Sequence, residues 1–201
     1  MIEETWLIQP VGMAISPLAN LGTAVDVGAT RGEWTRALAE SFKTVVAYEP
    51  DGRVGDEITT SDSVILRRQA VSSQCGEATL YRRPEACQSS LLLEHPIGGG
   101  SCAPAPVVDL ATVPTVTLDS EFEAGADFVK IDVEGVEAEI LRGCSPEPWQ
   151  RTVFVVECHD TERDVAEELA RLGKRIFRVS HPSPTAHPGH CWLIGINGAS
   201  E

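Results

Sequence analysis

The sequence predicts an α/β protein built on a doubly wound, mostly parallel sheet, and three observations support this. Short β-branched runs alternate with helical patterns in both halves of the chain. The spacing of these elements matches right-handed βαβ units, whose strands pair in parallel. Internal repeats are absent, and no pattern indicates a second domain. We therefore expect a single domain over residues 1–201.

The first part of the chain has the pattern strand, helix, strand, helix, strand. Residues 23–28 are β-rich and end in glycine, which predicts a buried strand that meets a tight turn. Apolar residues recur at helical spacing between 33 and 43. Residues 44–48 and 64–68 are the next two strands, with a short helical stretch between them.

The alternation breaks between residues 76 and 119. Residues 78–82 and 114–118 have the character of strands, so we expect an extra β-rich insertion. Residues 84–106, between them, are dense in Pro, Gly and Ser. A loop of this length is commonly functional, and the alternative is a surface insertion without a role.

The alternation then resumes. A helix is expected at 134–142, and a second helix follows Thr161, which could form a capping box with Asp164. The strand expected at 152–157 is the most continuously apolar one, which suggests a central position in the sheet. The remaining strands are expected at 127–132, 152–157, 175–179 and 191–196.

Charge excludes several classes of partner. The chain has 16 Lys and Arg against 30 Asp and Glu, a net charge of −14. Nucleic acids and anionic lipids attract clustered basic residues, so neither is an expected partner. No apolar run approaches the ~20 residues of a membrane-spanning helix, and the acidic start of the chain is unlike a signal peptide. We expect a cytoplasmic protein and leave its oligomeric state open, a homodimer included.

Cysteine, histidine and tryptophan have structural interpretations. The six cysteines include no CxxC pair, so free thiols are expected rather than disulfides or a zinc site. The histidines of residues 181–191 lie among prolines and a glycine, which favours a turn-rich connection over zinc binding. The four tryptophans are expected in the core or in the walls of a pocket: Trp6, Trp34, Trp149 and Trp192.

Polar residues follow the predicted strands one after another, where α/β proteins bind ligands. They are Asp26, Glu49, Asp132, Glu134, Glu157 and His159. Gly28 allows a sharp turn after the first strand, and Glu49 follows it by 21 residues. A carboxylate at that position can accept hydrogen bonds from both ribose hydroxyls of an adenosine cofactor, although Glu49 could also be a turn residue before Pro50.

The glycine pattern separates two such cofactors. A dinucleotide fingerprint needs glycine at positions 30 and 33, where this chain has Thr30 and Glu33. A carboxylate at 33 would repel pyrophosphate, whereas an acidic pocket suits the cationic S-adenosylmethionine. Two alternatives stay open: an NAD(P)-dependent oxidoreductase and a non-catalytic S-adenosylmethionine-binding module.

Several motifs together resemble the FkbM-type S-adenosylmethionine-dependent methyltransferases. The most specific is the run Lys-Ile-Asp-Val-Glu-Gly-Val-Glu at 130–137. Arg31 departs from the family pattern, which usually has a small or apolar residue there. The other stretches that carry the resemblance are residues 25–35, 46–51, 69–73, 89–90, 116–119 and 155–157.

The resemblance implies a seven-stranded, Rossmann-like class I methyltransferase fold. It further implies O-methylation of a hydroxyl on a small natural product or sugar. By this resemblance Asp132 lies near the transferred methyl group. The residues implied to contact the cofactor are Asp26, Gly28, Glu49, Ala70, Val71 and Asp132.

The acceptor is a small molecule whose identity the motifs do not encode. We expect His159 to act as the general base, although an exposed loop histidine is the simpler alternative. A divalent ion such as Mg²⁺, held by strand-end carboxylates and His159, is the less favoured alternative. Lys130 shares a strand face with Asp132, which predicts a structural ion pair. Residues 1–20 and 84–106 are expected to frame the acceptor site.

Overall fold

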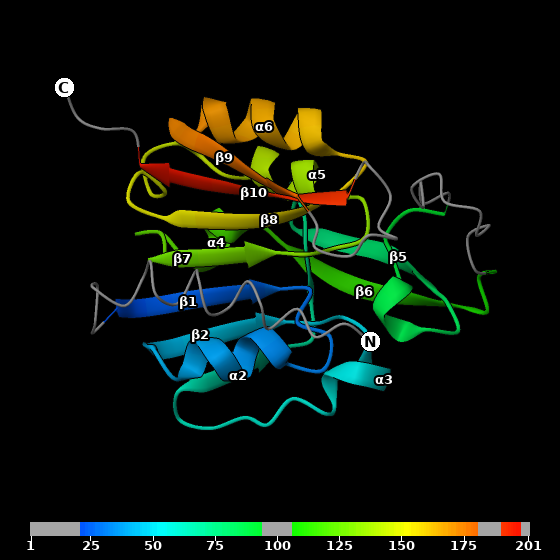
Figure 1. Cartoon of the computed structure of the whole chain (residues 1–201). Coiled ribbons are helices and arrows are strands. Elements are labelled where there is room, and N and C mark those ends of the chain that lie inside the picture. Colours follow the sequence, from blue (N-terminus) through cyan, green and yellow to red (C-terminus); the bar gives the residue numbers. More distant parts are fainter. Residues whose placement is uncertain (1–20, 94–105, 181–189, 198–201) are drawn as a thin grey trace.

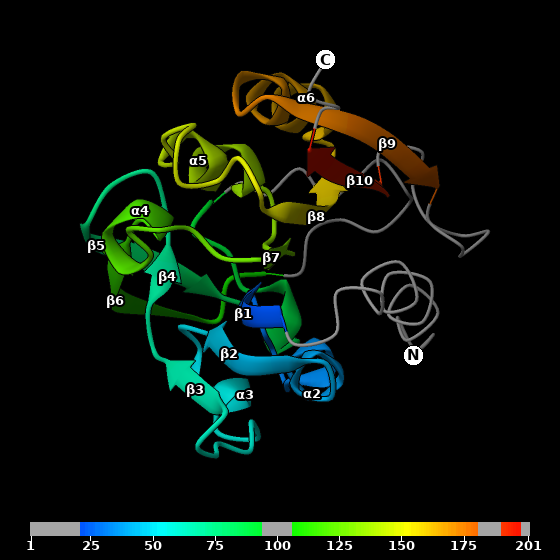
Figure 2. The same ribbon diagram turned by 90° about the vertical axis from the view of Figure 1, so that its left-hand side faces the viewer.

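A mixed seven-stranded sheet is the main element of the computed structural model, which describes residues 21–93, 106–180 and 190–197. Its strand order is β3-β2-β1-β7-β8-β10-β9 (Figures 1 and 2). Strands β3 to β8 of this order run parallel, and β10 runs antiparallel to both of its neighbours. The predicted doubly wound, mostly parallel sheet is confirmed. Its strands are β1 (Leu21–Val27), β2 (Phe42–Tyr48), β3 (Val64–Arg67), β7 (Phe128–Ile131), β8 (Val153–His159), β9 (Lys174–Ser180) and β10 (His190–Asn197).

A second, three-stranded sheet forms the expected β-rich insertion. Its order is β4-β6-β5, with β4 parallel and β5 antiparallel to β6. Ala70, Leu80 and Val113 form a small apolar cluster in this sheet. The strands are β4 (Ala70–Val71), β5 (Gly76–Arg82) and β6 (Asp109–Val116).

Helices lie on both faces of the main sheet, as Figure 2 shows edge-on. Helix α2 packs against β1 and β2, whereas α5 and α6 pack together on the other face. None of the described helices is long and apolar enough to cross a membrane. The helices are α2 (Glu33–Ala39), α3 (Gly52–Gly55), η2 (Ala86–Gln88), α4 (Leu118–Glu121), α5 (Glu137–Arg142) and α6 (Glu162–Arg171).

Successive residues of each central strand contribute to different cores. Ala24 packs with Trp34 of α2, whereas the next residue, Val25, joins the cluster that contains Ile140 of α5. This follows from the two-residue period of a strand. The rings of Trp34 and Trp192 lie 5.9 Å apart, and Trp149 is fully buried. The three described tryptophans therefore belong to the core, while Trp6 lies outside the described residues.

The start of α6 corrects one prediction. Thr161 is the N-cap residue, but its side chain makes no capping bond, so the predicted capping box with Asp164 is wrong. The Thr161 hydroxyl instead donates to Oε2 of Glu137 at 2.8 Å, because a buried carboxylate lies within its reach. Helix α5 also starts later than predicted, since Gly135 has a φ of +93° and forms a turn.

The described cysteines are free thiols, as expected: Cys75, Cys87, Cys144, Cys158 and Cys191. Cys102 and the predicted connection over residues 181–189 lie outside the described residues.

Candidate functional site

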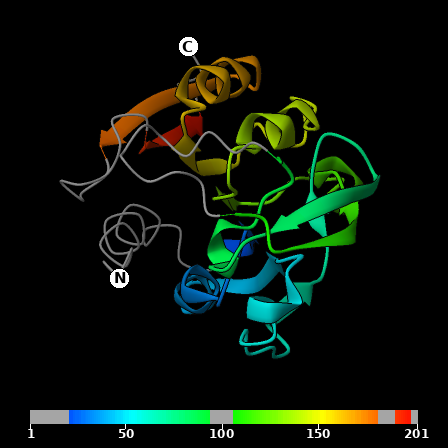
Figure 3. The ribbon, with the colours of Figure 1, turned by 90° about the vertical axis from the view of Figure 1, so that its right-hand side faces the viewer.

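A pocket opens at the carboxyl ends of β1, β2 and β7. These strand ends point toward the viewer in Figure 3. It encloses about 580 Å³, including space open to solvent. In the strand order, β2 and β3 lie on one side of β1, and β7 and β8 lie on the other. The pocket is therefore at the topological switch point, where α/β sheets bind ligands. Its lining comes from residues 27, 28, 30, 48–50, 69–71, 80, 86, 87, 89–91, 132–134 and 136.

Gly28 forms a part of the pocket where only glycine fits. Its φ is +75°, and its N–H donates to the carbonyl of Tyr48 at 3.0 Å. A Cβ at this position would lie 1.9 Å from the carbonyl oxygen of Asp132. The backbones that follow β1 and β7 therefore approach closely, and a ligand can contact bare backbone here.

Glu49, at the end of β2, is held rigidly by backbone donors. Its Oε1 accepts from the N–H of Asp51 at 2.7 Å, and its Oε2 accepts from the N–H of Thr30 at 2.9 Å. Burial raises the pKa of Glu49 to about 7, although both hydrogen bonds act to lower it. Each oxygen keeps acceptor capacity for a ligand hydroxyl.

One wall of the pocket is apolar. Ala70, Val71 and Leu80 line it and are buried in the small sheet. The segment around η2 closes the wall with Ser89 and Ser90. The Ser90 hydroxyl donates to the carbonyl of Glu134 at 2.6 Å, which joins this segment to the turn after β7.

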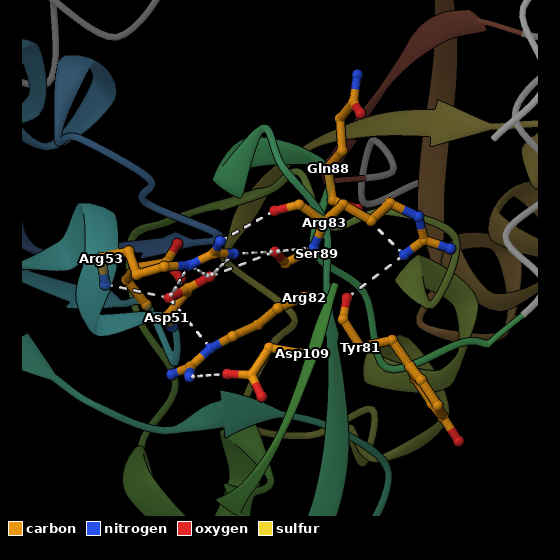
Figure 4. A network of polar contacts seen from close by, with 9 residues as sticks. Asp51, Arg53, Tyr81, Arg82, Arg83, Gln88, Ser89 and Asp109 are labelled. Carbon is orange, nitrogen blue, oxygen red and sulfur yellow. Dashed lines mark hydrogen bonds and ion pairs between the residues drawn. The ribbon is translucent and has the colours of Figure 1, made fainter. Parts of the chain in front are cut away.

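The position of that wall depends on a polar network that the sequence did not reveal (Figure 4). Asp51 is fully buried and pairs with Arg53 at 2.6 Å and with Arg82 at 3.5 Å. Arg53 also donates to the carbonyl of Arg83 and to Ser89, and Arg82 pairs with Asp109. The turn after β2 is thus tied to the segment that follows β5. The network joins residues up to 36 positions apart through Arg53 and Ser89, and no local pattern indicates it.

Asp26 lies beneath the pocket and is not among the residues that line it. It is fully buried, accepts from the hydroxyl of Thr35 at 2.6 Å and pairs with Lys130 at 3.1 Å. Lys130 also pairs with Asp132 at 3.3 Å and donates to the carbonyl of Gly28 at 2.8 Å. The expected ion pair is therefore present, and Asp26 supports the pocket through it.

The other end of the pocket is acidic, with Asp132 and Glu134 in its lining. His159, at the end of β8, lies behind them and is almost fully buried. Its Nε2 is 4.0 Å from Oδ1 of Asp132 and 3.9 Å from Oε2 of Glu134. Its Nδ1 is 2.7 Å from Oε1 of Glu137, a buried carboxylate that sequence reasoning left without a role.

The surroundings shift the pKa values of His159 and Asp132 in opposite directions. Burial acts to lower the pKa of His159, but the hydrogen bond to Glu137 and the nearby carboxylates raise it well above its usual value. Burial acts to raise the pKa of Asp132, but Lys130, His159 and a hydrogen bond with Glu157 lower it overall. Among the described residues, Asp132, Glu157 and His159 bring one possible metal-ligand atom each within 4.8 Å of one another.

Part of the predicted acceptor frame cannot be located. Residues 1–20 and 94–105 lie outside the described residues. Of the described part of 84–106, the residues from Ala86 to Leu91 contribute to the pocket. Arg31 is half-exposed and pairs with Glu57.

Comparison with known proteins gives one family match. Residues 26–179 match the model of the methyltransferase FkbM domain. No curated protein matches the sequence.

Solved structures give fold-level similarity. A methyltransferase FkbM from Methylobacillus flagellatus superposes with a TM-score of 0.58 at 15% identity, over 89% of this chain and 45% of that one. This chain thus spans less than half of that relative. A precorrin 8w decarboxylase from Methanobacterium thermoautotrophicum has a TM-score of 0.56 at 14% identity, covering 96% of this chain and 90% of its own. Magnesium protoporphyrin IX methyltransferase from Synechocystis, solved with bound SAM, has a TM-score of 0.52 at 10% identity, with coverages of 98% and 81%.

Proposed function

This chain belongs to the FkbM methyltransferase family, and we propose that it transfers a methyl group from S-adenosylmethionine to a hydroxyl of a small natural product or sugar. The observation that carries the proposal is the pocket at the switch point of the sheet. There Gly28 leaves backbone exposed to a ligand, and Glu49 is fixed as a hydrogen-bond acceptor.

The residues of the pocket fit this cofactor from one end to the other. Glu49 would accept the ribose hydroxyls, and the wall of Ala70, Val71 and Leu80 would border the adenine. The carboxylates of Asp132 and Glu134 would face the positively charged end. When bound, S-adenosylmethionine supplies an electrophilic methyl group on a sulfonium.

The same charges disfavour the dinucleotide alternative. Glu33 lies in the first turn of α2, where a pyrophosphate would bind in a dinucleotide-binding fold. Glu49, Asp132 and Glu134 add three carboxyl groups around the pocket, and the described lining includes no Lys or Arg. Repulsion of phosphate and attraction of a sulfonium follow from the same acidic lining.

The protein would accelerate methyl transfer mainly by alignment. Holding an acceptor oxygen in line with the methyl–sulfur bond can supply roughly 7–11 kcal/mol of the barrier. The hydroxyl must also lose its proton. We assign the positioning and activation of this hydroxyl to the acidic end of the pocket, where Asp132 and His159 lie 4.0 Å apart.

Calorimetry with S-adenosylhomocysteine and with NAD⁺ tests the cofactor. We expect binding of the first only. Glu49→Gln should weaken it about ten- to a hundredfold, because hydrogen bonds to charged groups contribute about 1.5–3 kcal/mol each. Glu57→Gln is the matched control, since Glu57 is exposed and outside the pocket lining. Binding of NAD⁺ without S-adenosylhomocysteine would refute the proposal.

The acceptor class requires a second experiment. Incubation with S-adenosylmethionine and a panel of sugars and small natural products should give a product heavier by CH₂, detected by mass spectrometry. A methylated nitrogen or carbon in that product, rather than oxygen, would contradict O-methylation.

A further inference from the structure

We propose that Asp132, Glu157 and His159 form a divalent-cation site at the acidic end of the pocket. Each offers one ligand atom, and the three atoms lie within 4.8 Å of one another. Asp132 directly follows β7, and the other two residues lie on the neighbouring strand β8. The role of this cation in methyl transfer rests on the proposed function, whereas its binding does not.

Neighbouring contacts fix the orientation of two of the ligands. Asp132 directs Oδ2 to Lys130 at 3.3 Å, which turns Oδ1 toward His159. His159 directs Nδ1 to Glu137 at 2.7 Å, which turns Nε2 toward Asp132. A carboxylate behind a ligating histidine is the usual way in which proteins orient such a ring.

The distance between two of the proposed ligand atoms suits a shared ion. Oδ1 of Asp132 and Nε2 of His159 are 4.0 Å apart, too far for a hydrogen bond. Two atoms that each lie about 2.0–2.2 Å from one ion can be separated by up to about 4.4 Å. Oε2 of Glu134, 3.9 Å from the same nitrogen, lies within range of the ion or of its water.

Charge and burial distinguish this group from an acidic surface. The side chains of Asp132 and His159 are 19% and 6% exposed, and Glu157 is buried. Four carboxylates surround His159, so they outnumber the cations here even when this histidine is protonated: those of Asp132, Glu134, Glu137 and Glu157. Lys130, the lysine that pairs with Asp132, is shared with Asp26 on the neighbouring strand. A doubly charged cation would offset this concentration of negative charge in a poorly solvated environment.

The donor set favours a metal that accepts both oxygen and nitrogen. Two carboxylates with one imidazole suit Mn²⁺, Fe²⁺ or Zn²⁺ better than the harder Mg²⁺. Three protein ligands leave positions for water or for an acceptor hydroxyl. A hydroxyl on such an ion has a lowered pKa and releases its proton to water. Its oxygen then forms the new C–O bond as the C–S bond breaks, and a neutral thioether leaves.

Mn²⁺ titration of the chelator-treated full chain, followed by electron paramagnetic resonance, tests the site. We expect one ion per chain and a nitrogen coupling from an imidazole. His159→Gln and Asp132→Asn should each weaken binding at least tenfold, and Glu137→Gln should weaken it about 10–100-fold through loss of orientation. Glu139→Gln is the matched control, because Glu139 lies on α5 but is exposed and pairs with Arg142.

A cooperative urea-unfolding transition shows that each variant is folded, because Asp132 itself lines the pocket proposed for the cofactor. Absence of Mn²⁺ binding at millimolar concentration, or binding without nitrogen coupling, would overturn the site. Methyl transfer that survives complete metal removal would overturn the cation's role in the reaction. If Mn²⁺ binds but S-adenosylhomocysteine does not, the proposed function fails and the metal site stands.

Discussion

Substitution of Gly28 by alanine tests the close approach of two backbones beneath the pocket. Gly28, Gly125 and Gly173 have almost the same φ, +75°, +75° and +74°. A left-handed conformation costs a non-glycine residue about 1–2 kcal/mol, so all three alanine variants share this loss. They differ in what the new Cβ would meet.

At Gly173 the Cβ has nothing within 4 Å. At Gly28 it would lie 1.9 Å from the carbonyl oxygen of Asp132, and at Gly125 it would lie 2.0 Å from that of Pro148. Relief of such an overlap requires a shift of the backbone, which adds about 1–3 kcal/mol. We therefore expect losses of about 1–2 kcal/mol for Gly173→Ala and about 2–5 kcal/mol for the other two.

Urea unfolding measures these losses, and calorimetry with S-adenosylhomocysteine separates the two clashing positions. Gly125 precedes β7, at the opposite end of the sheet from the pocket. Gly125→Ala should therefore keep its affinity under folding conditions, whereas Gly28→Ala should lose it. Equal stabilities of Gly28→Ala and Gly173→Ala would refute the inferred contact. Equal loss of affinity in the variants at 28 and 125 would show that instability, not pocket shape, is responsible.

Three other substitutions give independent tests. The pKa of Glu49 is raised from 4.5 to about 7 by burial, so its carboxyl disfavours the folded state as pH rises through this range. Glu49→Gln should therefore gain about 3 kcal/mol relative to the wild type between pH 4.5 and 7, and parallel stability–pH curves would contradict this. Lys174 donates to the carbonyls of Trp149, Gln150 and Thr152. Lys174→Met should lower the free energy of unfolding by about 1–3 kcal/mol per carbonyl left without a partner, as measured in urea. Asp51→Asn should weaken the network behind the pocket wall and cost about 1–3 kcal/mol; an unchanged unfolding curve and unchanged S-adenosylhomocysteine affinity would contradict that role.

The sequence predicted the main sheet well because buried parallel strands leave a strong local signal. Residues 23–28 and 152–157 are almost continuously apolar, and both became interior strands. The polar residues at strand ends were informative for the same reason, since parallel strands bring their carboxyl ends together. Glu49 and Asp132 thus line one pocket although they are far apart in sequence.

Contacts between side chains of different elements were not predictable in this way. The hydroxyl of Thr161 could accept from the backbone of α6 or donate to a carboxylate, and the buried Glu137 determined the outcome. The network of Asp51 depends on how the insertion folds back over the turn after β2. Asp26 lies near the end of a buried strand, as pocket residues often do, but it forms an ion pair with Lys130 and does not line the pocket.

The pairing of β1 with β7 has a consequence for folding kinetics. Val27 and Ile131 are register partners, although about a hundred residues separate them in the chain. Strands β1, β2 and β3 pair over much shorter sequence separations. The entropy of closing a long loop therefore opposes the pairing of β1 with β7 more than the pairing of these three strands. The pocket includes residues that follow both strands, so it forms when β7 pairs with β1. Acquisition of ligand binding during refolding should therefore lag behind the first secondary structure and report the step that completes the sheet.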